Sequence, residues 1–251
     1  MIAMITGASA GIGEATAIRF AQGGYHVVVT GRRTALLEEL KKKLESTYHI
    51  KVWILSFDVR DQEEVTHHLS LLPSVWKEVD VLVNNAGLAV GLQSIQEGIV
   101  DDWERMIDTN IKGLLYVTRM VAPWMASRKK GHIVNIGSIA GKEVYPNGNV
   151  YCATKHAVDA LSKAMRCDLL PSGVRVSQIC PGAVDTDFSN VRFKGDRERA
   201  ANVYKGFEPL HATDVAEAIW WITQLPPHVT VNDMVLMPTA QGSTTLFHKQ
   251  V

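Results

Sequence analysis

Two side chains with complementary acid–base chemistry, Tyr151 and Lys155, lie four residues apart in a stretch of helical period. Residues at this spacing share one face of a helix, so the phenol and the ammonium would lie side by side. A phenol with its ordinary pKa of about 10 is a weak base at neutral pH, but a neighbouring ammonium stabilises the phenolate and lowers that pKa. The pair could therefore exchange a proton with a substrate hydroxyl or carbonyl. Because the same pattern is common on solvated helices, it needs support from other residues.

Ser138 and Asn110 supply that support. Ser138 directly follows a predicted strand, thirteen residues before Tyr151, so its hydroxyl could face the same crevice and donate to a substrate oxygen. Asn110 lies inside a predicted helix, where its amide is more useful as a water ligand than as a helix former. The sequence thus predicts a proton-transfer site made of Asn110, Ser138, Tyr151 and Lys155.

A glycine-rich turn near the start of the chain predicts a dinucleotide-binding site. Gly7, Gly11 and Gly13 occur where the first predicted strand runs into a helix. They permit a tight turn and the close approach of a pyrophosphate to backbone N–H groups, and the helix N-terminus adds a partial positive charge. An ATP-type phosphate loop is excluded, because no Gly-Lys-Ser/Thr follows.

Arg32 and Arg33 indicate which dinucleotide is bound. They follow the second predicted strand, where an NAD-selective site normally places a carboxylate for the ribose 2′-hydroxyl. Two guanidinium groups would instead pair with a 2′-phosphate, and they are poorly placed to stabilise the helix that begins after them. We therefore expect NADP(H), with two merely solvated arginines as the alternative. Further cofactor contacts are expected at Asp58, Val59, Asn85, Ala86 and Gly87.

The elements that position these residues alternate between short β-branched runs and longer runs of helical period. Strands such as 27–29 and 81–83 are apolar throughout, which is typical of a parallel sheet covered on both faces. The sequence predicts an α/β fold, a single Rossmann-type domain with a doubly wound parallel seven-stranded sheet and helices on both faces. Strands are expected at Ile2–Thr6, His26–Thr30, Lys51–Phe57, Asp80–Asn84, His132–Gly137, Val174–Cys180 and Asp233–Met237, and helices at Gly11–Gln22, Thr34–Tyr48, Gln62–Leu72, Asp101–Met125, Val150–Leu170 and Thr213–Gln224.

No repeat or linker divides the chain, so we expect one domain over residues 1–251. The stretch 185–209 is less regular and follows the end of a strand, where it would hang over the ligand crevice. We expect a substrate lid there, with an ordinary surface excursion as the alternative.

The composition of the chain limits the kinds of partner that the protein could bind. The chain has 26 basic and 26 acidic residues, so it carries no overall field that would attract nucleic acid or an anionic membrane. No apolar run approaches the roughly 18 residues of a membrane span, and Ile2 already begins a strand, so we expect no targeting segment. Three cysteines without CxxC spacing favour a reducing compartment, and we expect the protein to be cytoplasmic. His67 and His68 are adjacent and cannot share a helix face, so no metal site is expected.

The segments 6–13 and 84–87, together with Asn110, Ser138, Tyr151, Lys155 and Pro181-Gly182, resemble the short-chain dehydrogenase/reductase family in order and spacing over essentially the whole chain. The resemblance implies that Tyr151 exchanges the proton, that Lys155 tunes it and binds the nicotinamide ribose, that Ser138 orients the carbonyl and that Asn110 holds a relay water. It also implies cofactor contacts by Ser9, Ile12, Tyr151, Lys155, Pro181, Gly182, Val184 and Thr186.

The resemblance further implies a homotetramer formed through the helices at 101–125 and 150–170. An apolar stripe agrees with such an interface but could equally belong to the core: Leu114, Leu115, Val117, Val121 and Trp124. One position departs from some NADP-selective members, which carry a basic residue where this chain has Ala10. The choice of cofactor therefore depends on Arg32, Arg33 and Ser9.

Within the family, the chain is similar to NADP-dependent 3-hydroxy acid dehydrogenases in the segments 30–33, 103–110, 148–151 and 188–196, and at Trp220-Trp221 and Leu225-Pro226. This similarity implies oxidation of serine, allo-threonine or 3-hydroxypropanoate-type substrates to 3-oxo acids, and the reverse reaction.

Substrate recognition leaves several alternatives open. Arg192 or Lys194 on the expected lid could bind the substrate carboxylate, with surface packing as the alternative, and the charges of Lys142 and Glu143 could alter the substrate range. Reduction of 3-oxoacyl thioesters or of many carbonyls remains a second possibility. A non-catalytic NADP(H) sensor is a third, although a sensor has no need of Ser138, Tyr151 and Lys155.

Overall fold

A seven-stranded parallel sheet forms the centre of the computed structural model, which describes residues 1–250 and, for residues 200 and 201, the backbone only. The strand order is β3-β2-β1-β4-β5-β6-β9: the chain adds β2 and β3 on one side of β1 and all later strands on the other side. This change of side leaves a crevice between the carboxyl ends of β1 and β4. The predicted doubly wound fold and its seven strands are confirmed. The strands are β1 Ile2–Ile5, β2 His26–Gly31, β3 Val52–Ser56, β4 Val81–Asn84, β5 Gly131–Ile136, β6 Val174–Pro181 and β9 Asp233–Leu236.

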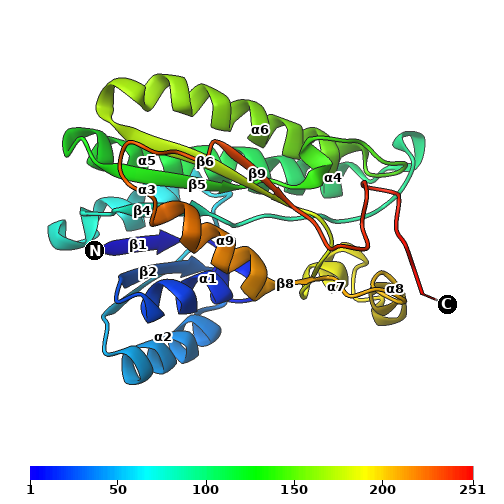
Figure 1. The fold of residues 1–251 in the computed structure, drawn as a ribbon, viewed down its shortest axis with the longest axis horizontal. Coiled ribbons are helices and arrows are strands. Elements are labelled where there is room, and N and C mark those ends of the chain that lie inside the picture. Colours follow the sequence, from blue (N-terminus) through cyan, green and yellow to red (C-terminus); the bar gives the residue numbers. More distant parts are fainter. Residues whose placement is uncertain (251) are drawn as a thin grey trace.

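Helices cover both faces of this sheet (Figure 1). Helices α1, α2 and α9 pack on one face, and α3, α5 and α6 pack on the other. Their bounds are α1 Gly11–Gln22, α2 Thr34–Tyr48, α3 Gln62–Ser70, α4 Val100–Ile107, α5 Leu114–Ser127, α6 Asn149–Leu169 and α9 Ala212–Thr223, with 3-10 turns at Ser74–Lys77, Ile95–Glu97, Ile139–Gly141 and Leu170–Ser172.

Successive strand residues point to opposite faces and are buried on both. Val27 and Val29 belong to the same buried cluster as Phe20 of α1, whereas Val28 belongs to the cluster on the other face, which includes Val121 of α5. Each fully buried side chain of this kind contributes about 1.5–3 kcal/mol of transfer free energy. Because every pair of neighbouring strands in this sheet is parallel, the carboxyl ends of all seven strands meet at one edge.

The helix predicted at 101–125 is present as one uninterrupted helical run, but it contains a π-helical turn that the sequence analysis did not predict. The chain forms α4, then a π-helical turn over Asp108–Gly113, then α5. The wide turn contains Asn110, and a Cβ on Gly113 would lie only 2.7 Å from the Val59 side chain. A π turn of this kind often accompanies a functional site, because it redirects backbone and side-chain groups.

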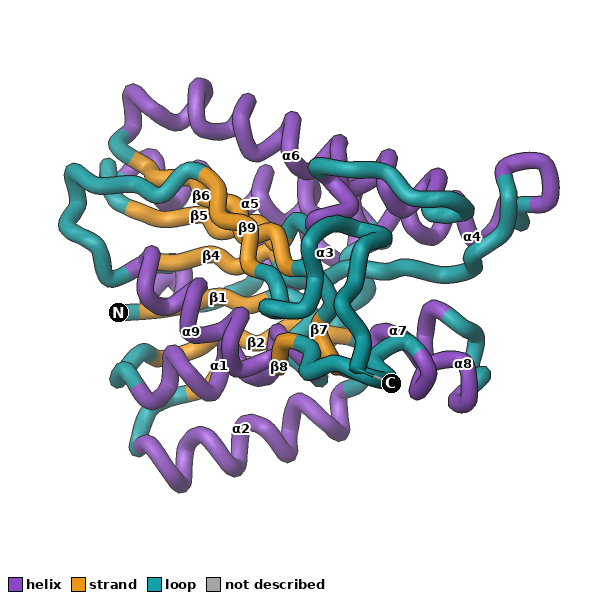
Figure 2. Tube along the Cα trace, turned by 45° about the vertical axis from the view of Figure 1, so that its right-hand side comes forward, coloured by secondary structure: helices purple, strands orange, loops and turns teal. Residues whose placement is uncertain are grey.

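The segment at 185–209, expected to be irregular, contains two short helices, α7 Phe188–Arg192 and α8 Arg197–Asn202. Its ends are joined by a two-stranded parallel sheet of β7 Val184–Asp185 and β8 Leu210–His211. Figures 1 and 2 place α7 and α8 beside each other, beyond the carboxyl ends of the central strands. The segment is therefore a closed loop with its own local structure.

Candidate active site

A cavity of about 650 Å³ lies beyond the carboxyl ends of the strands. Nearly all the residues predicted to form a site line it, although they come from distant parts of the chain. They are Gly7, Ser9, Gly11, Ile12, Arg32, Arg33, Asp58, Val59, Asn85, Ala86, Gly87, Ser138, Tyr151, Lys155, Pro181, Gly182, Val184, Thr186 and Arg192. Gly13 and Asn110 are not part of the lining, and both lie behind it.

The glycine turn has the geometry of a phosphate cradle. Gly7 and Gly11 have φ of +67° and +56°, a conformation that residues with a Cβ rarely adopt. A Cβ on Gly13 would collide with the carbonyl oxygen of Gly7, so Gly13 permits the close packing beneath the turn. The Asn85 amide donates to the carbonyls of Thr6 at 2.8 Å and Gly7 at 3.2 Å. Helix α1 begins here without a side-chain cap, which leaves its first N–H groups free for an anion.

Positive charge is concentrated at the outer end of the cavity. Arg33 donates to the Ser9 hydroxyl at 3.0 and 3.2 Å, which draws its guanidinium over the glycine turn. The Arg32 side chain is 65% exposed and lies 3.7 Å from Asp58, which pairs more closely with Arg60 at 2.7 Å. Burial opposes the ionisation of Asp58, but hydrogen bonds from Arg60 outweigh it and lower the pKa of this carboxyl.

These residues fit the 2′-phosphate of NADP. Three arginines, Arg32, Arg33 and Arg60, line this part of the cavity together with one carboxylate, Asp58, and no acidic side chain occupies the end of β2, where an NAD-selective site would need one. Arg60 was not predicted from the sequence, although its position directly after Asp58-Val59 could have indicated it.

Tyr151 and Lys155 lie in the first turns of α6, and both line the inner part of the cavity. The Lys155 ammonium lies 5.9 Å from the centre of the Tyr151 ring and donates to the carbonyl of Ile136 at 2.8 Å. Burial lowers the pKa of Lys155 to about 8. The lysine therefore still carries most of a positive charge at neutral pH.

The pKa of Tyr151 shifts in the direction opposite to the sequence prediction. Burial raises it well above the usual value and the neighbouring Tyr145 adds to this, whereas the Ser138 hydroxyl and the Arg192 guanidinium oppose the shift. In the protein by itself the phenol is thus a hydrogen-bond donor, and a base only when further positive charge is added.

Asn110, predicted from the sequence as the ligand of a relay water, does not line the cavity, and its amide is hydrogen-bonded within the protein. Its oxygen accepts from the Leu88 N–H at 2.7 Å, and its nitrogen donates to the Leu88 carbonyl at 2.8 Å and to Thr154 at 2.9 Å. Asn110 therefore ties the segment after β4 to helix α6. The sequence could not show this, because all three contacts join segments distant along the chain.

The two lid cations that the sequence analysis proposed as carboxylate ligands, Arg192 and Lys194, have different surroundings. Lys194 is paired with Asp102 of α4 at 2.7 Å and does not line the cavity. Arg192 does line it, donates to the Tyr145 hydroxyl at 2.8 Å and lies over the rings of Tyr145 and Tyr151. Among residues 1–250 no carboxylate lies within ion-pair distance of Arg192. Of these two cations, Arg192 is thus the one available to an anionic ligand in the cavity.

Several lining residues were missed by the sequence analysis. Phe188 packs against Tyr151 with ring centres 5.9 Å apart, and Tyr145 holds Arg192. The segment after β9 also lines the cavity through Gln241, Thr244 and Phe247. These residues carry no local motif, and only their position after the carboxyl end of a strand could have indicated them.

Within residues 1–250, no helix combines the length and the apolar character that crossing a bilayer requires. In the same part of the chain, no three His, Cys, Asp or Glu side chains gather as metal ligands.

Comparisons with known proteins agree with this geometry. The family model described as "short chain dehydrogenase" matches residues 1–197. The NADP-dependent 3-hydroxy acid dehydrogenase YdfG of Escherichia coli (strain K12) is 47% identical over 252 residues, covering 100% of both chains. The NADP-dependent 3-hydroxy acid dehydrogenase of Schizosaccharomyces pombe is 40% identical and covers 98% of this chain and 96% of its own. A solved structure, the closed form of serine dehydrogenase complexed with NADP⁺, has a TM-score of 0.94 at 47% identity, with both chains covered completely.

Proposed function

Because the chain belongs to the short-chain dehydrogenase family, we propose that it oxidises short 3-hydroxy acids to 3-oxo acids with NADP⁺ and catalyses the reverse reduction. The substrate class includes serine, allo-threonine and 3-hydroxypropanoate. One observation carries it: Arg192 lines the cavity beside Tyr151 and has no carboxylate partner among the described residues. A guanidinium in this state is suited to bind a substrate carboxylate.

The residues at the inner end of the cavity have separate functions in the proton transfer. In the direction of oxidation, the Tyr151 oxygen accepts the proton of the substrate hydroxyl, and in reduction it returns that proton to the carbonyl oxygen. Ser138 donates a hydrogen bond to the same substrate oxygen and orients it. When bound, NADP⁺ supplies the hydride acceptor and additional positive charge.

Lys155 has two functions in this mechanism. Its ammonium binds the nicotinamide ribose and keeps a cation near the phenol, which favours the phenolate. The bond to the Ile136 carbonyl fixes the lysine at the end of β5. Asn110 supports the site from behind: its bonds to Leu88 and Thr154 hold the segment after β4 against α6, and we propose this in place of a water-binding amide.

The cofactor contacts follow the cavity from end to end. Gly7, Gly11 and the start of α1 hold the pyrophosphate, and Arg32, Arg33 and Ser9 hold the 2′-phosphate. Gly13 allows the turn to pack closely. The other contacts are Ile12, Asp58, Val59, Asn85, Ala86, Gly87, Pro181, Gly182, Val184 and Thr186.

Steady-state kinetics test the substrate class. We expect serine, allo-threonine and 3-hydroxypropanoate to be oxidised with NADP⁺ far faster than with NAD⁺. Acetoacetyl thioester reduction is the comparison, because a 3-oxoacyl thioester or general carbonyl reductase would prefer it. Faster turnover of the thioester than of any 3-hydroxy acid would overturn the proposed substrate.

A Tyr151→Phe variant tests the mechanism and excludes a non-catalytic sensor. Removing the hydroxyl should lower kcat by about 10²–10⁴-fold while NADPH binding stays close to wild type. If Tyr151→Phe binds NADPH normally and keeps full turnover, the proton-transfer mechanism is wrong.

We also propose a lid, a cytoplasmic location and a homotetramer. Residues of the 185–209 loop line the cavity, which supports a lid over a single domain. The three cysteines are unpaired, which agrees with a reducing compartment. Of the apolar stripe on α5, Leu114, Val117 and Val121 belong to the core and Trp124 packs partly buried against it, which leaves Leu115, 37% exposed, for a subunit contact. Light scattering during size-exclusion chromatography measures the assembly.

A further inference from the structure

We propose that Lys142 is a positioning residue of the reaction, which holds the turn bearing Ser138 at a fixed place on the helix bearing Tyr151. The inference rests on the proposed function, because it assigns Lys142 a part in the alignment of the proposed catalytic groups. Lys142 itself does not line the cavity, so it acts through other residues.

The first observation is that Lys142 ends the turn of the proposed catalytic serine. Ser138 is the N-cap of the 3-10 turn Ile139–Gly141, and its hydroxyl accepts from the Ala140 N–H at 3.1 Å. Lys142 follows this turn directly. A shift of the Lys142 backbone would therefore move the serine hydroxyl with it.

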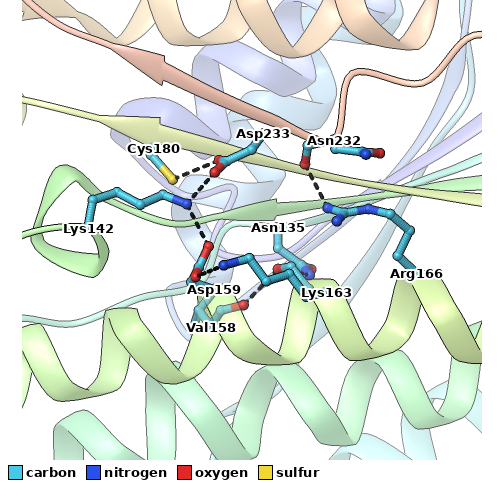
Figure 3. Close-up of polar contacts among 10 residues, drawn as sticks. Asn135, Lys142, Val158, Asp159, Lys163, Arg166, Cys180, Asn232 and Asp233 are labelled. Carbon is cyan, nitrogen blue, oxygen red and sulfur yellow. Dashed lines mark hydrogen bonds and ion pairs between the residues drawn. The ribbon is translucent and has the colours of Figure 1, made fainter.

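The second observation is the set of partners of the Lys142 ammonium. It lies 2.6 Å from a carboxylate oxygen of Asp159 and also binds the carboxylate of Asp233 (Figure 3). Asp159 is on α6, one turn beyond Lys155, and Asp233 begins β9. One side chain thus joins the serine turn, the helix of the proton-transfer pair and the last strand of the sheet.

The third observation is how closely the turn approaches the helix. A Cβ on Gly141 would lie 2.6 Å from the carbonyl oxygen of Lys155, so the turn packs directly on the α6 backbone at the catalytic lysine. Packing limits the separation of the two elements, but it does not by itself prevent sliding along the helix. The ion pairs of Lys142 supply that constraint. The side chains of Lys142 and Asp159 are only 22% and 15% exposed.

The chain contains a matched control at the same carboxylate. Lys163 lies 2.6 Å from the other oxygen of Asp159, but it is on the same helix, four residues later, and its side chain is 62% exposed. Removing Lys163 takes the same charge from the same carboxylate without breaking a link between segments. A positioning function predicts different results for the two lysines, whereas general charge balance predicts similar ones.

The test compares Lys142→Met, Lys142→Arg and Lys163→Met in the full-length enzyme. A misplacement of about 1 Å in a catalytic group can cost about 10²-fold, so we expect Lys142→Met to lower kcat roughly 10–100-fold. The KM for NADP⁺ and the dissociation constant of NADPH should stay within about twofold of wild type, because the cofactor contacts lie elsewhere. Lys142→Arg should restore most of kcat, and Lys163→Met should stay near wild type.

A double-mutant cycle separates positioning from general destabilisation. If Lys142 acts through Ser138, then Lys142→Met should reduce kcat much less in a Ser138→Ala background than in wild type. Equal losses in both backgrounds, or a kcat for Lys142→Met within twofold of Lys163→Met, would overturn the proposal. Should Lys142→Met fail to fold, Asp233→Asn in the same cycle gives the decisive comparison, because it removes one partner of Lys142 and keeps the side-chain size.

The two proposals fail in different ways. Absence of 3-hydroxy acid oxidation by the wild-type enzyme refutes the proposed substrate. The Lys142 comparison is then made on whichever alcohol or carbonyl substrate the wild-type enzyme converts with NADP(H), since it depends only on ratios between variants.

Discussion

Arg192 donates a hydrogen bond of 2.8 Å to the hydroxyl of Tyr145, and its guanidinium carbon lies 5.6 Å from the centre of the Tyr151 ring. Tyr145 thereby holds a cation beside the phenol that exchanges the proton in the proposed mechanism. Both phenols present aromatic surface to the guanidinium, which stabilises its position over the rings.

Replacing Arg192 should change the KM of carboxylate substrates more than the KM of uncharged substrates. A charge-assisted hydrogen bond contributes about 1.5–3 kcal/mol, so Arg192→Met should raise the KM for 3-hydroxypropanoate roughly 10–100-fold. An uncharged secondary alcohol is the control: its KM should change little, because it loses only the effect of Arg192 on the pKa of Tyr151. Equal losses for the acid and the alcohol would show that Arg192 supports the cavity without binding the carboxylate.

The choice of cofactor should depend on the arginines that follow β2. Replacing Arg33 or Arg32 by serine removes a guanidinium from the outer end of the cavity, so we expect the KM for NADP⁺ to rise roughly 10-fold or more. The KM for NAD⁺, which has no 2′-phosphate, should remain nearly constant. A parallel rise for both cofactors would place the arginines outside the 2′-phosphate site.

The ion pair of Lys194 with Asp102 should stabilise the lid. The Asp102 side chain is only 3% exposed, and its other cation, Arg105, lies 3.8 Å away. Lys194→Met leaves this carboxylate poorly compensated and should lower the free energy of unfolding by about 1–3 kcal/mol. The double variant Asp102→Asn with Lys194→Met should recover part of that loss, as urea unfolding would measure. If the double variant is the sum of the two single losses, the two residues are not coupled.

The buried Lys155 should make stability depend on pH. Its folded pKa of about 8 lies below the ordinary 10.5, so the unfolded chain binds this proton more tightly between these values. The contribution of Lys155 to stability is therefore least favourable below pH 8 and rises with pH up to about 10.5, by about 3 kcal/mol.

Lys155→Met removes this titration and provides the reference. The free energy of unfolding of wild type minus that of Lys155→Met should increase between pH 7 and pH 10 in the absence of cofactor. Subtracting the two proteins cancels the groups that they share. A constant difference would mean that Lys155 does not lose its proton more readily in the folded protein.

The sequence by itself determined the α/β fold, the strand positions, the glycine turn and the Tyr151–Lys155 pair. These depend on local patterns: apolar runs give buried parallel strands, and a spacing of four residues puts two side chains on one face of a helix. The two arginines after β2 were likewise predictable, because the end of that strand has a fixed place in a doubly wound sheet.

Tertiary structure alone decided features that depend on distant partners. The amide of Asn110 faces Leu88 and Thr154, and Lys194 pairs with Asp102 instead of facing the cavity. The raised pKa of Tyr151 has the same origin, because burial by surrounding segments outweighs the effect expected from its own helix. Contacts between residues far apart in the chain leave no periodic signal in the sequence. Which of these residues interact is therefore decided only when the chain folds.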